Sequence, residues 1–132
     1  MILRFAAVAA FVAISASPVL ADTTTYTINV PFSAKKLPLK APSGSPISYK
    51  ITCFIEAPNT KSPFIGAGIA PVPLDPFGNF LGSVIAVPVT KATGGIAGTS
   101  YACNFNGFDQ NATNVPGMFT GTSSVTGNAN FP

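Results

Sequence analysis

The sequence contains no histidine and no tryptophan, and only 8% of its 132 residues are charged. Without histidine the chain has no His-assisted serine or cysteine triad and no zinc site built on histidine. A formal charge of only +3 disfavours nucleic-acid binding. The 47% apolar share argues against disorder, and 13 prolines with 12 glycines argue against a helical bundle. What remains is one domain that is not helical.

Residues 1–21 are typical of a cleaved signal peptide. Arg4 provides a positive start, residues 5–14 are an unbroken apolar run, and Val19-Leu20-Ala21 fits a small-residue cleavage site. A retained membrane anchor is the alternative, but Pro18 interrupts the segment before the roughly 20 apolar residues that a span needs. We therefore expect a mature domain of residues 22–132, secreted or periplasmic, with no stable membrane insertion. The alanine-rich leader suggests a bacterial source.

Cys53 and Cys103 are the only cysteines. In an exported chain an even number predicts a disulfide, because oxidising compartments preserve such bonds. Closing a loop of about 50 residues contributes about 4 kcal/mol by the chain-entropy argument. Two free thiols for redox or metal chemistry are the alternative, but the chain has no CxxC spacing and no histidine.

Alternation of apolar and polar residues dominates the mature chain and predicts strands. It places Phe32 and Phe105 at inward positions, and it predicts one apolar face formed by Ile47, Tyr49, Ile51, Cys53 and Ile55. Pro31 cannot donate a ladder hydrogen bond, so the first strand is expected at a sheet edge. The segment 80–90 is apolar and β-branched, which predicts a strand with both faces partly covered. Residues 33–46 and 106–116 are expected to be loops. The expected strands lie within residues 26–32, 47–56, 64–72, 80–90, 100–106 and, more weakly, 118–131.

These strands and short turns predict an all-β antiparallel sandwich with a disulfide between its two sheets. Tyr101-Ala102-Cys103 resembles the Tyr-x-Cys of immunoglobulin-like domains, and Cys53 resembles their first cysteine. The resemblance covers residues 47–106 and implies an immunoglobulin-like architecture. The chain lacks the tryptophan that packs on the bridge in that family, and fold alone does not give function.

A pair of carboxylates, of the kind that hydrolyses glycosides, would have to come from Glu56 with Asp75 or Asp109. Solvated surface acids are the simpler interpretation. The segment 109–114 has alternating oxygen ligands but lacks the glycine and the closing glutamate of a calcium loop. We therefore expect no catalytic residue, no metal and no cofactor.

Two groups of residues are candidates for a binding surface. Phe54, Phe77 and Phe108 occupy positions in which an aromatic ring would be exposed, and exposed aromatic patches mark interaction sites. The second group is the lysine cluster Lys35, Lys36 and Lys40, which would attract anionic envelope surfaces. The alternatives are ordinary packing for the phenylalanines and, for the lysines, a solvated loop that protects an edge strand.

The sequence thus favours a small non-enzymatic binding or structural protein of the cell envelope. Its partner would be an envelope or extracellular protein or a glycan. One rival hypothesis is a subunit of a surface assembly that pairs through the edge strand at residues 26–32. The other is a hydrolase that uses Glu56 with Asp75 or Asp109.

Overall fold

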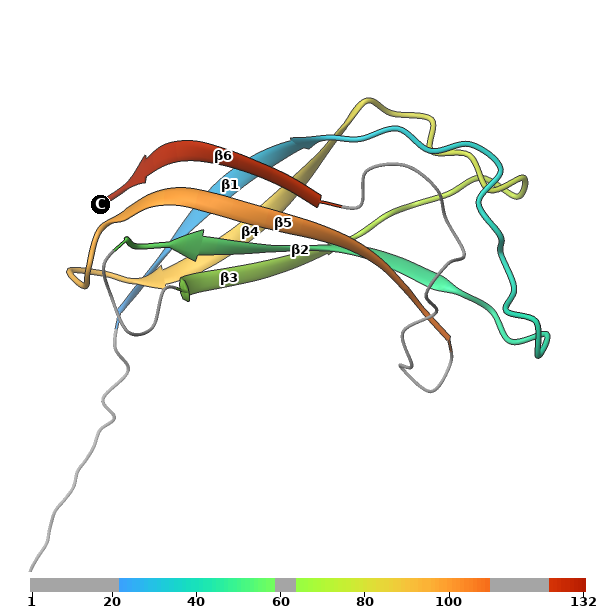
Figure 1. Ribbon diagram of the computed structural model, residues 1–132, viewed down its shortest axis with the longest axis horizontal. Helices are drawn as coiled ribbons and strands as arrows, with labels where there is room; N and C mark the ends of the chain where they lie inside the picture. The colour runs from blue at the N-terminus through green and yellow to red at the C-terminus, as the bar shows by residue number, and fades with distance from the viewer. Residues whose placement is uncertain (1–21, 59–63, 110–123) are drawn as a thin grey trace, which may run out of the picture.

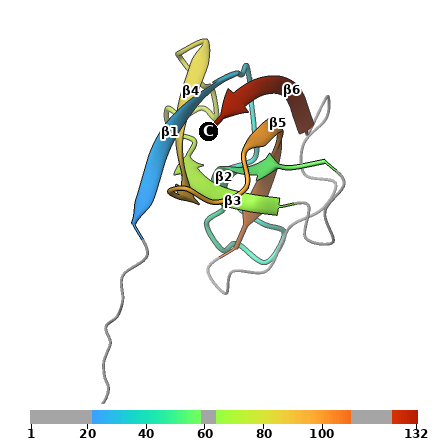
Figure 2. The same ribbon diagram turned by 90° about the vertical axis from the view of Figure 1, so that its left-hand side faces the viewer.

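The computed structural model describes residues 22–58, 64–109 and 124–132, so the predicted signal peptide lies outside the described residues. Its six antiparallel strands form one sheet in the spatial order β1-β4-β3-β2-β5-β6. The sheet curves into a half-barrel (Figures 1 and 2). The prediction of an all-β chain is confirmed for this part of the chain, in which no helix could cross a membrane. The strands are β1 (Thr23–Pro31), β2 (Ser48–Glu56), β3 (Phe64–Pro71), β4 (Val84–Ala92), β5 (Gly98–Phe108) and β6 (Ser124–Phe131).

Strict alternation gives the sheet one buried face and one exposed face. In β2 the predicted apolar set, including Tyr49, Ile51 and Ile55, is buried, and its neighbours are not. β4 alternates in the same way, with Val87 and Val89 fully buried between exposed residues. The prediction that both faces of this strand are partly covered is therefore wrong, because nothing among the described residues packs on its convex side.

Aromatic rings fill the concave interior at one end of the sheet. Phe32 and Phe105, which the alternation placed inward, have ring centroids 4.8 Å apart. Tyr49 stacks on Phe105 at 5.4 Å, and Phe80 packs on Phe32 at 5.4 Å. These rings extend the aliphatic core toward the loops that precede β2 and β4.

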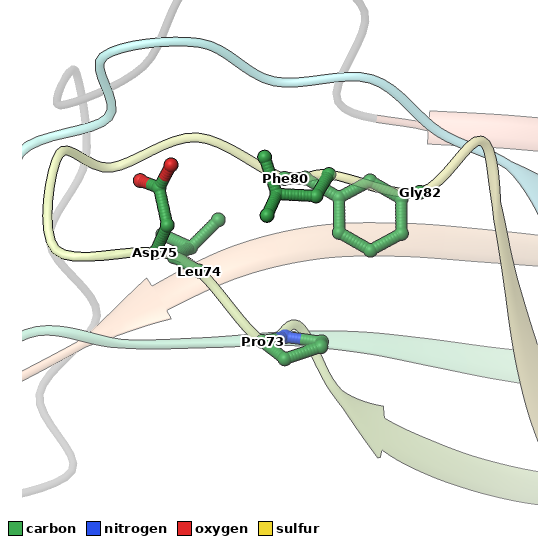
Figure 3. A pocket seen from close by; sticks show the side chains of 6 residues that line it. Pro73, Leu74, Asp75, Phe80 and Gly82 are labelled. Atoms are coloured by element: carbon green, nitrogen blue, oxygen red, sulfur yellow. The ribbon is translucent and has the colours of Figure 1, made fainter.

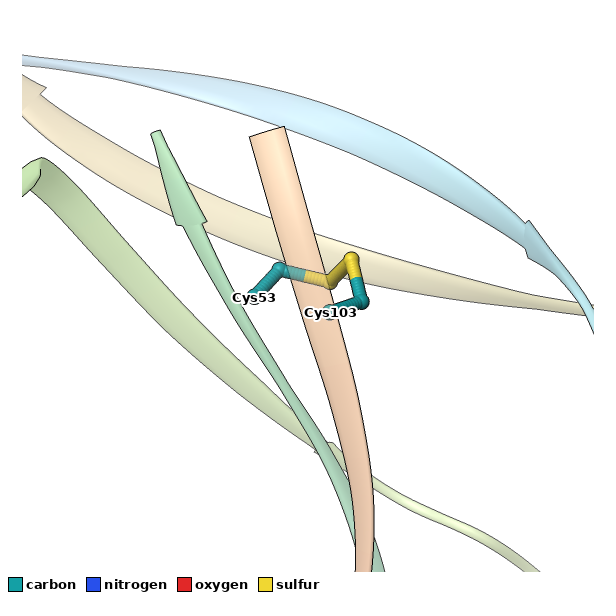
Figure 4. The surroundings of a disulfide bond; sticks show 2 residues. All are labelled: Cys53 and Cys103. Atoms are coloured by element: carbon teal, nitrogen blue, oxygen red, sulfur yellow. A yellow bond between two sulfur atoms is a disulfide. The ribbon is translucent and has the colours of Figure 1, made fainter. Parts of the chain in front are cut away.

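The disulfide between Cys53 and Cys103 forms, as predicted, but in a different place from the one expected (Figure 4). The two cysteines face each other across β2 and β5, which are hydrogen-bonded neighbours, with a Cα–Cα distance of 4.0 Å. The sequence predicted a bridge between two packed sheets. The described strands instead form a single sheet, in which β2 pairs directly with β5 from Ser48 to Glu56.

The contact between β3 and β4 is the weakest junction in the sheet. Only Gly66 with Lys91 and Ala67 with Thr90 are paired. The next hydrogen-bonded pair in this register would join Ile69 to Pro88, and proline has no N–H to donate. A Cβ at Gly68 would also overlap the Pro88 carbonyl. The ladder therefore ends there, and β4 turns away from β3 (Figure 1).

The two ends of the open sheet meet through side chains. The Tyr26 ring of β1 packs edge-on against Phe131 of β6 at 5.3 Å. The Tyr26 hydroxyl donates to the Pro132 carbonyl oxygen at 2.7 Å, and the Lys91 ammonium donates to the same oxygen at 3.3 Å. Both donors lie on the concave side of β1 and β4. The end of β6 is therefore held beneath these two strands.

Removing the disulfide should weaken the fold without abolishing it, since the β2–β5 ladder remains. We expect the double variant Cys53→Ala/Cys103→Ala to lose up to about 4 kcal/mol of unfolding free energy in urea denaturation. Reductant should destabilise the wild type by a similar amount and leave the double variant unchanged. A wild type whose stability does not respond to reductant would contradict a stabilising bridge.

Candidate functional site

Two loops that are about 40 residues apart in sequence pair at one end of the sheet. The Leu37 N–H donates to the Gly78 carbonyl at 2.9 Å, and the Phe80 N–H donates to the Ala34 carbonyl at 3.0 Å. The Lys36 N–H also donates to Asn79 Oδ1 at 2.9 Å. We call residues 33–40 and 73–83 the loop platform. Glycine is required at 78, where φ is 83° and a Cβ would overlap Leu37.

Asp75 organises the second loop of the platform. Its Oδ1 accepts the N–H groups of Phe77 at 2.9 Å and Asn79 at 2.8 Å. Its Oδ2 accepts from Asn79 Nδ2 at 3.3 Å. The backbone hydrogen bond from Asn79 is the main cause that lowers the pKa of Asp75 below its ordinary value. The carboxylate is thus engaged in holding the loop.

Tyr49 ties the first loop of the platform to the sheet. Its side chain is 3% exposed, and its hydroxyl donates to the Pro38 carbonyl at 2.7 Å. Burial raises the pKa of Tyr49 above the ordinary 10.0, because the ionised phenolate would lose hydration. The neutral phenol therefore anchors the loop at ordinary pH.

The platform exposes lysines and large apolar side chains together. Lys35, Lys36 and Lys40 are exposed, and Phe77 and Leu81 are 77% and 83% exposed. Beside them lies an open hollow of about 290 Å³, whose lining residues Leu74, Asp75 and Phe80 come from the second loop (Figure 3). A second hollow of about 360 Å³ adjoins it at Gly82 and reaches Phe32. The surface is cationic at one loop and apolar at the other.

The structure unites only part of the predicted binding surface. Phe77 lies in the loop that pairs with the segment carrying Lys35 and Lys36. Phe54 lies on the convex face of the sheet, where its ring packs on Phe64 at 4.9 Å. Phe108 lies opposite Ser48, with Lys50 Nζ 5.8 Å from its ring centre. Phe54 and the position opposite Phe108 are six residues apart along β2, so roughly 20 Å of strand separates the two positions.

The carboxylates of the hydrolase hypothesis are far apart. Glu56 pairs with Ser100 at one end of the β2–β5 ladder, and its Oε1 accepts from the Ser100 hydroxyl at 3.2 Å. Asp109 directly follows Phe108, which is at the opposite end of the ladder, eight residues and roughly 26 Å along β5 from Ser100. Asp75 follows β3 at that same distant end, where Pro71 pairs with Lys50. Glycoside hydrolysis needs carboxylates about 5–10 Å apart, so these pairings are not formed.

Metal ligation was not expected from the sequence. Within residues 22–58, 64–109 and 124–132, no three His, Cys, Asp or Glu side chains gather into a group that could hold an ion. Of the segment 109–114, only Asp109 belongs to the described residues.

The sequence interpretation overlooked two residues. Lys91 is 3% exposed and lies inside the half-barrel, bonded to the Ala92 and Pro132 carbonyls. The alternation could have revealed it, because Lys91 continues the inward series of Ile85, Val87 and Val89. The sequence predicts Leu81 within a strand at residues 80–90, but β4 begins at Val84. Leu81 instead lies in the second loop of the platform, where it is exposed.

Comparison with protein-family models, with curated proteins and with solved structures finds no match to this chain. The platform must therefore be interpreted from its own chemistry.

The Tyr49 anchor predicts an alkaline weakness. The folded state raises the pKa of the Tyr49 phenol above its ordinary value of 10.0. The contribution of the neutral phenol to stability is therefore complete below pH 10.0 and is lost as the pH rises through the raised pKa. Tyr49→Phe should cost about 1 kcal/mol at neutral pH by losing the bond to Pro38. Thermal denaturation across this pH range should show a steeper alkaline decline in the wild type than in Tyr49→Phe. Parallel declines would contradict the assignment.

The Asp75 bonds predict a loop that loosens in acid. The folded state lowers the pKa of the Asp75 carboxyl below its ordinary value of 3.8. The contribution of the carboxylate to stability is therefore complete above pH 3.8 and is lost as the pH falls through the lowered pKa. Amide hydrogen exchange at Phe77 and Asn79 should accelerate in Asp75→Ala, while Val87 in the sheet keeps its protection. Unchanged protection of the loop amides would contradict the role given to Asp75.

Proposed function

We propose that this protein is a non-enzymatic binding protein that acts outside the cytoplasm and attaches through the loop platform to an anionic glycan. The observation that carries the proposal is the pairing of the two loops. It sets Lys35 and Lys36 beside the segment that bears Phe77, which is 77% exposed.

The platform combines the two chemistries that such a ligand needs. Exposed lysines attract phosphate or carboxylate groups and raise the local concentration of an anionic partner. An exposed phenyl ring offers the apolar face of a sugar a surface on which to pack, and exposed apolar side chains are typical of interaction sites. The hydrogen bonds of Asp75 and Tyr49 hold both loops, so little order must be gained on binding.

The disulfide supports a location outside the cytoplasm. Cys53 and Cys103 are bonded, and bonds of this kind persist in oxidising compartments. The signal peptide expected at residues 1–21 would bring the chain there. Export, and the choice between the periplasm and the medium, remain part of the proposal.

The hydrolase alternative receives less support. Glu56 lies at the far end of the sheet from Asp75 and Asp109, and Asp75 is engaged by its own loop. The immunoglobulin-like resemblance adds little to a functional argument, since the cysteines that carry it are neighbours within one sheet. The binding part of the proposal therefore rests on the loop platform, and the location outside the cytoplasm rests on the disulfide and the expected signal peptide.

Binding should depend on the charge of two lysines. A lysine near an anionic surface contributes about 1 kcal/mol, so Lys35→Gln/Lys36→Gln should weaken binding roughly thirtyfold. The probe is dextran sulfate, with neutral dextran as the uncharged comparison, measured by calorimetry at low salt. Lys35→Arg/Lys36→Arg keeps the charge and should keep the affinity.

The aromatic contribution is tested separately with Phe77→Ser, which should also weaken binding. Ile96→Ser is the matched control, because Ile96 is 58% exposed in the turn at the other end of the sheet. Vesicles containing phosphatidylglycerol distinguish a lipid headgroup from a glycan. Binding to vesicles alone, or equal affinity of the glutamine and arginine variants, would refute the proposal.

A further inference from the structure

The outer edge of β1 has backbone groups that no other described strand pairs. The Thr93 N–H donates to the Asp22 carbonyl at 2.9 Å, and the Phe32 N–H donates to the Ser83 carbonyl at 3.0 Å. Both bonds continue the β1–β4 register at its two ends. Bonded positions alternate along an antiparallel ladder, so even-numbered residues of β1 face β4. The odd-numbered residues, Thr23, Thr25, Thr27 and Asn29, direct their N–H and C=O groups outward.

This edge has few of the features that usually prevent strands from pairing. Natural edges are blunted by lysines, by bulges or by short length. β1 has nine residues in unbroken register with β4 and carries no charged side chain. Only Pro31, at its end, would interrupt a new ladder. The other edge strand, β6, is less suited, because its register shifts between Gly98 and Ser100 of β5.

The end of β6 does not occupy this edge. Pro132 accepts hydrogen bonds from Tyr26 and Lys91, whose side chains lie on the concave face. The final residues of β6 are therefore beneath β1 and β4, and Figure 2 shows this end of the chain inside the curve of the sheet.

We propose that the β1 edge pairs antiparallel with the β1 edge of a second copy of this chain, so that two half-barrels share one continuous sheet. The two-fold axis passes through Tyr26, which places Thr25 opposite Thr27 and Thr23 opposite Asn29. Each of these pairs can exchange two backbone hydrogen bonds, and neither uses Pro31. Opposed threonines suit each other across antiparallel strands, and no like charges meet.

The second copy is favoured over an unrelated strand because the edge is complementary to itself in this register. Each of the four outward positions Thr23, Thr25, Thr27 and Asn29 meets a small uncharged hydroxyl or amide side chain of its twin. The inference is independent of the glycan proposal, because the loop platform lies beyond the ends of the strands and none of its residues belongs to β1.

A charge exchange tests both the interface and its register. The side chains of Thr25 and Thr27 are exposed and face Thr90 and Pro88 within the chain, so substitution should leave the fold intact. Sedimentation across a wide concentration range should show the wild type approaching a dimer. Thr25→Lys/Thr27→Lys should remain monomeric, because each lysine meets a lysine of its twin. Thr25→Lys/Thr27→Asp should dimerise again, because each lysine now meets an aspartate.

Matched thermal transitions for all variants are the control for folding, and Thr126→Lys places a charge on β6 instead. This last variant should dimerise like the wild type. A wild type that stays monomeric at its highest soluble concentration would overturn the proposal, as would loss of the dimer in Thr126→Lys. A dimer in Thr25→Lys/Thr27→Lys would do the same. A β1 edge that binds only a strand of another protein would likewise refute it.

Discussion

A single sheet with one apolar face must bury that face against itself when no helix or second sheet covers it. The described strands satisfy this constraint by curving, so that β1 and β4 lie over β2 and β5 with Ile51, Ile55, Val87 and Val89 between them. Burial of apolar surface drives the closure, because each such side chain contributes about 1.5–3 kcal/mol. The curvature in turn needs a weak point in the ladder. Pro88 and Gly68 provide it between β3 and β4.

The same constraint determines where the chain can present functional side chains. The concave face is filled by the core, including the Cys53–Cys103 bridge and the aromatic rings around Phe105. Chemistry must then lie on the convex face, on the edges or at the ends of the strands. The loop platform lies at an end, where Tyr49 extends from the core to hold the first loop and Asp75 holds the second. The core and the proposed binding surface are therefore connected by a few hydrogen bonds.

An open sheet differs from a closed barrel because it keeps two edges. Among the described residues the two ends are joined by side chains, since Tyr26 and Lys91 donate to Pro132, the residue that follows β6. The buried lysine serves this closure, since its ammonium group finds carbonyl oxygens inside the half-barrel. Because the join lies beneath β1, it leaves the backbone of that strand available. The uncharged side chains along this edge are consistent with a surface that meets another strand.

Local patterning determined much of the fold. The alternation of Tyr49, Ile51, Cys53 and Ile55 predicted the inward face of β2 correctly, and Pro31 correctly predicted that β1 lies at an edge. These predictions succeeded because a period of two and the missing N–H of proline act within a few residues. The even cysteine count predicted the disulfide because two cysteines in an exported chain leave only one possible pairing. The absence of histidine excludes histidine chemistry whatever fold the chain adopts, so the sequence alone decides this point.

The tertiary structure decided which strands are neighbours, and with that everything that depends on distance. It placed Cys53 beside Cys103 within one sheet instead of between two. It separated Glu56 from Asp75 and Asp109, and it brought Lys36 to Asn79 although 43 positions divide them. Strand order depends on contacts between residues far apart in the chain, and the ladder between β3 and β4 ends where Gly68 meets Pro88; no short window of sequence contains either. The sequence by itself therefore determined the faces and the chemistry of the strands, while their pairing created the site.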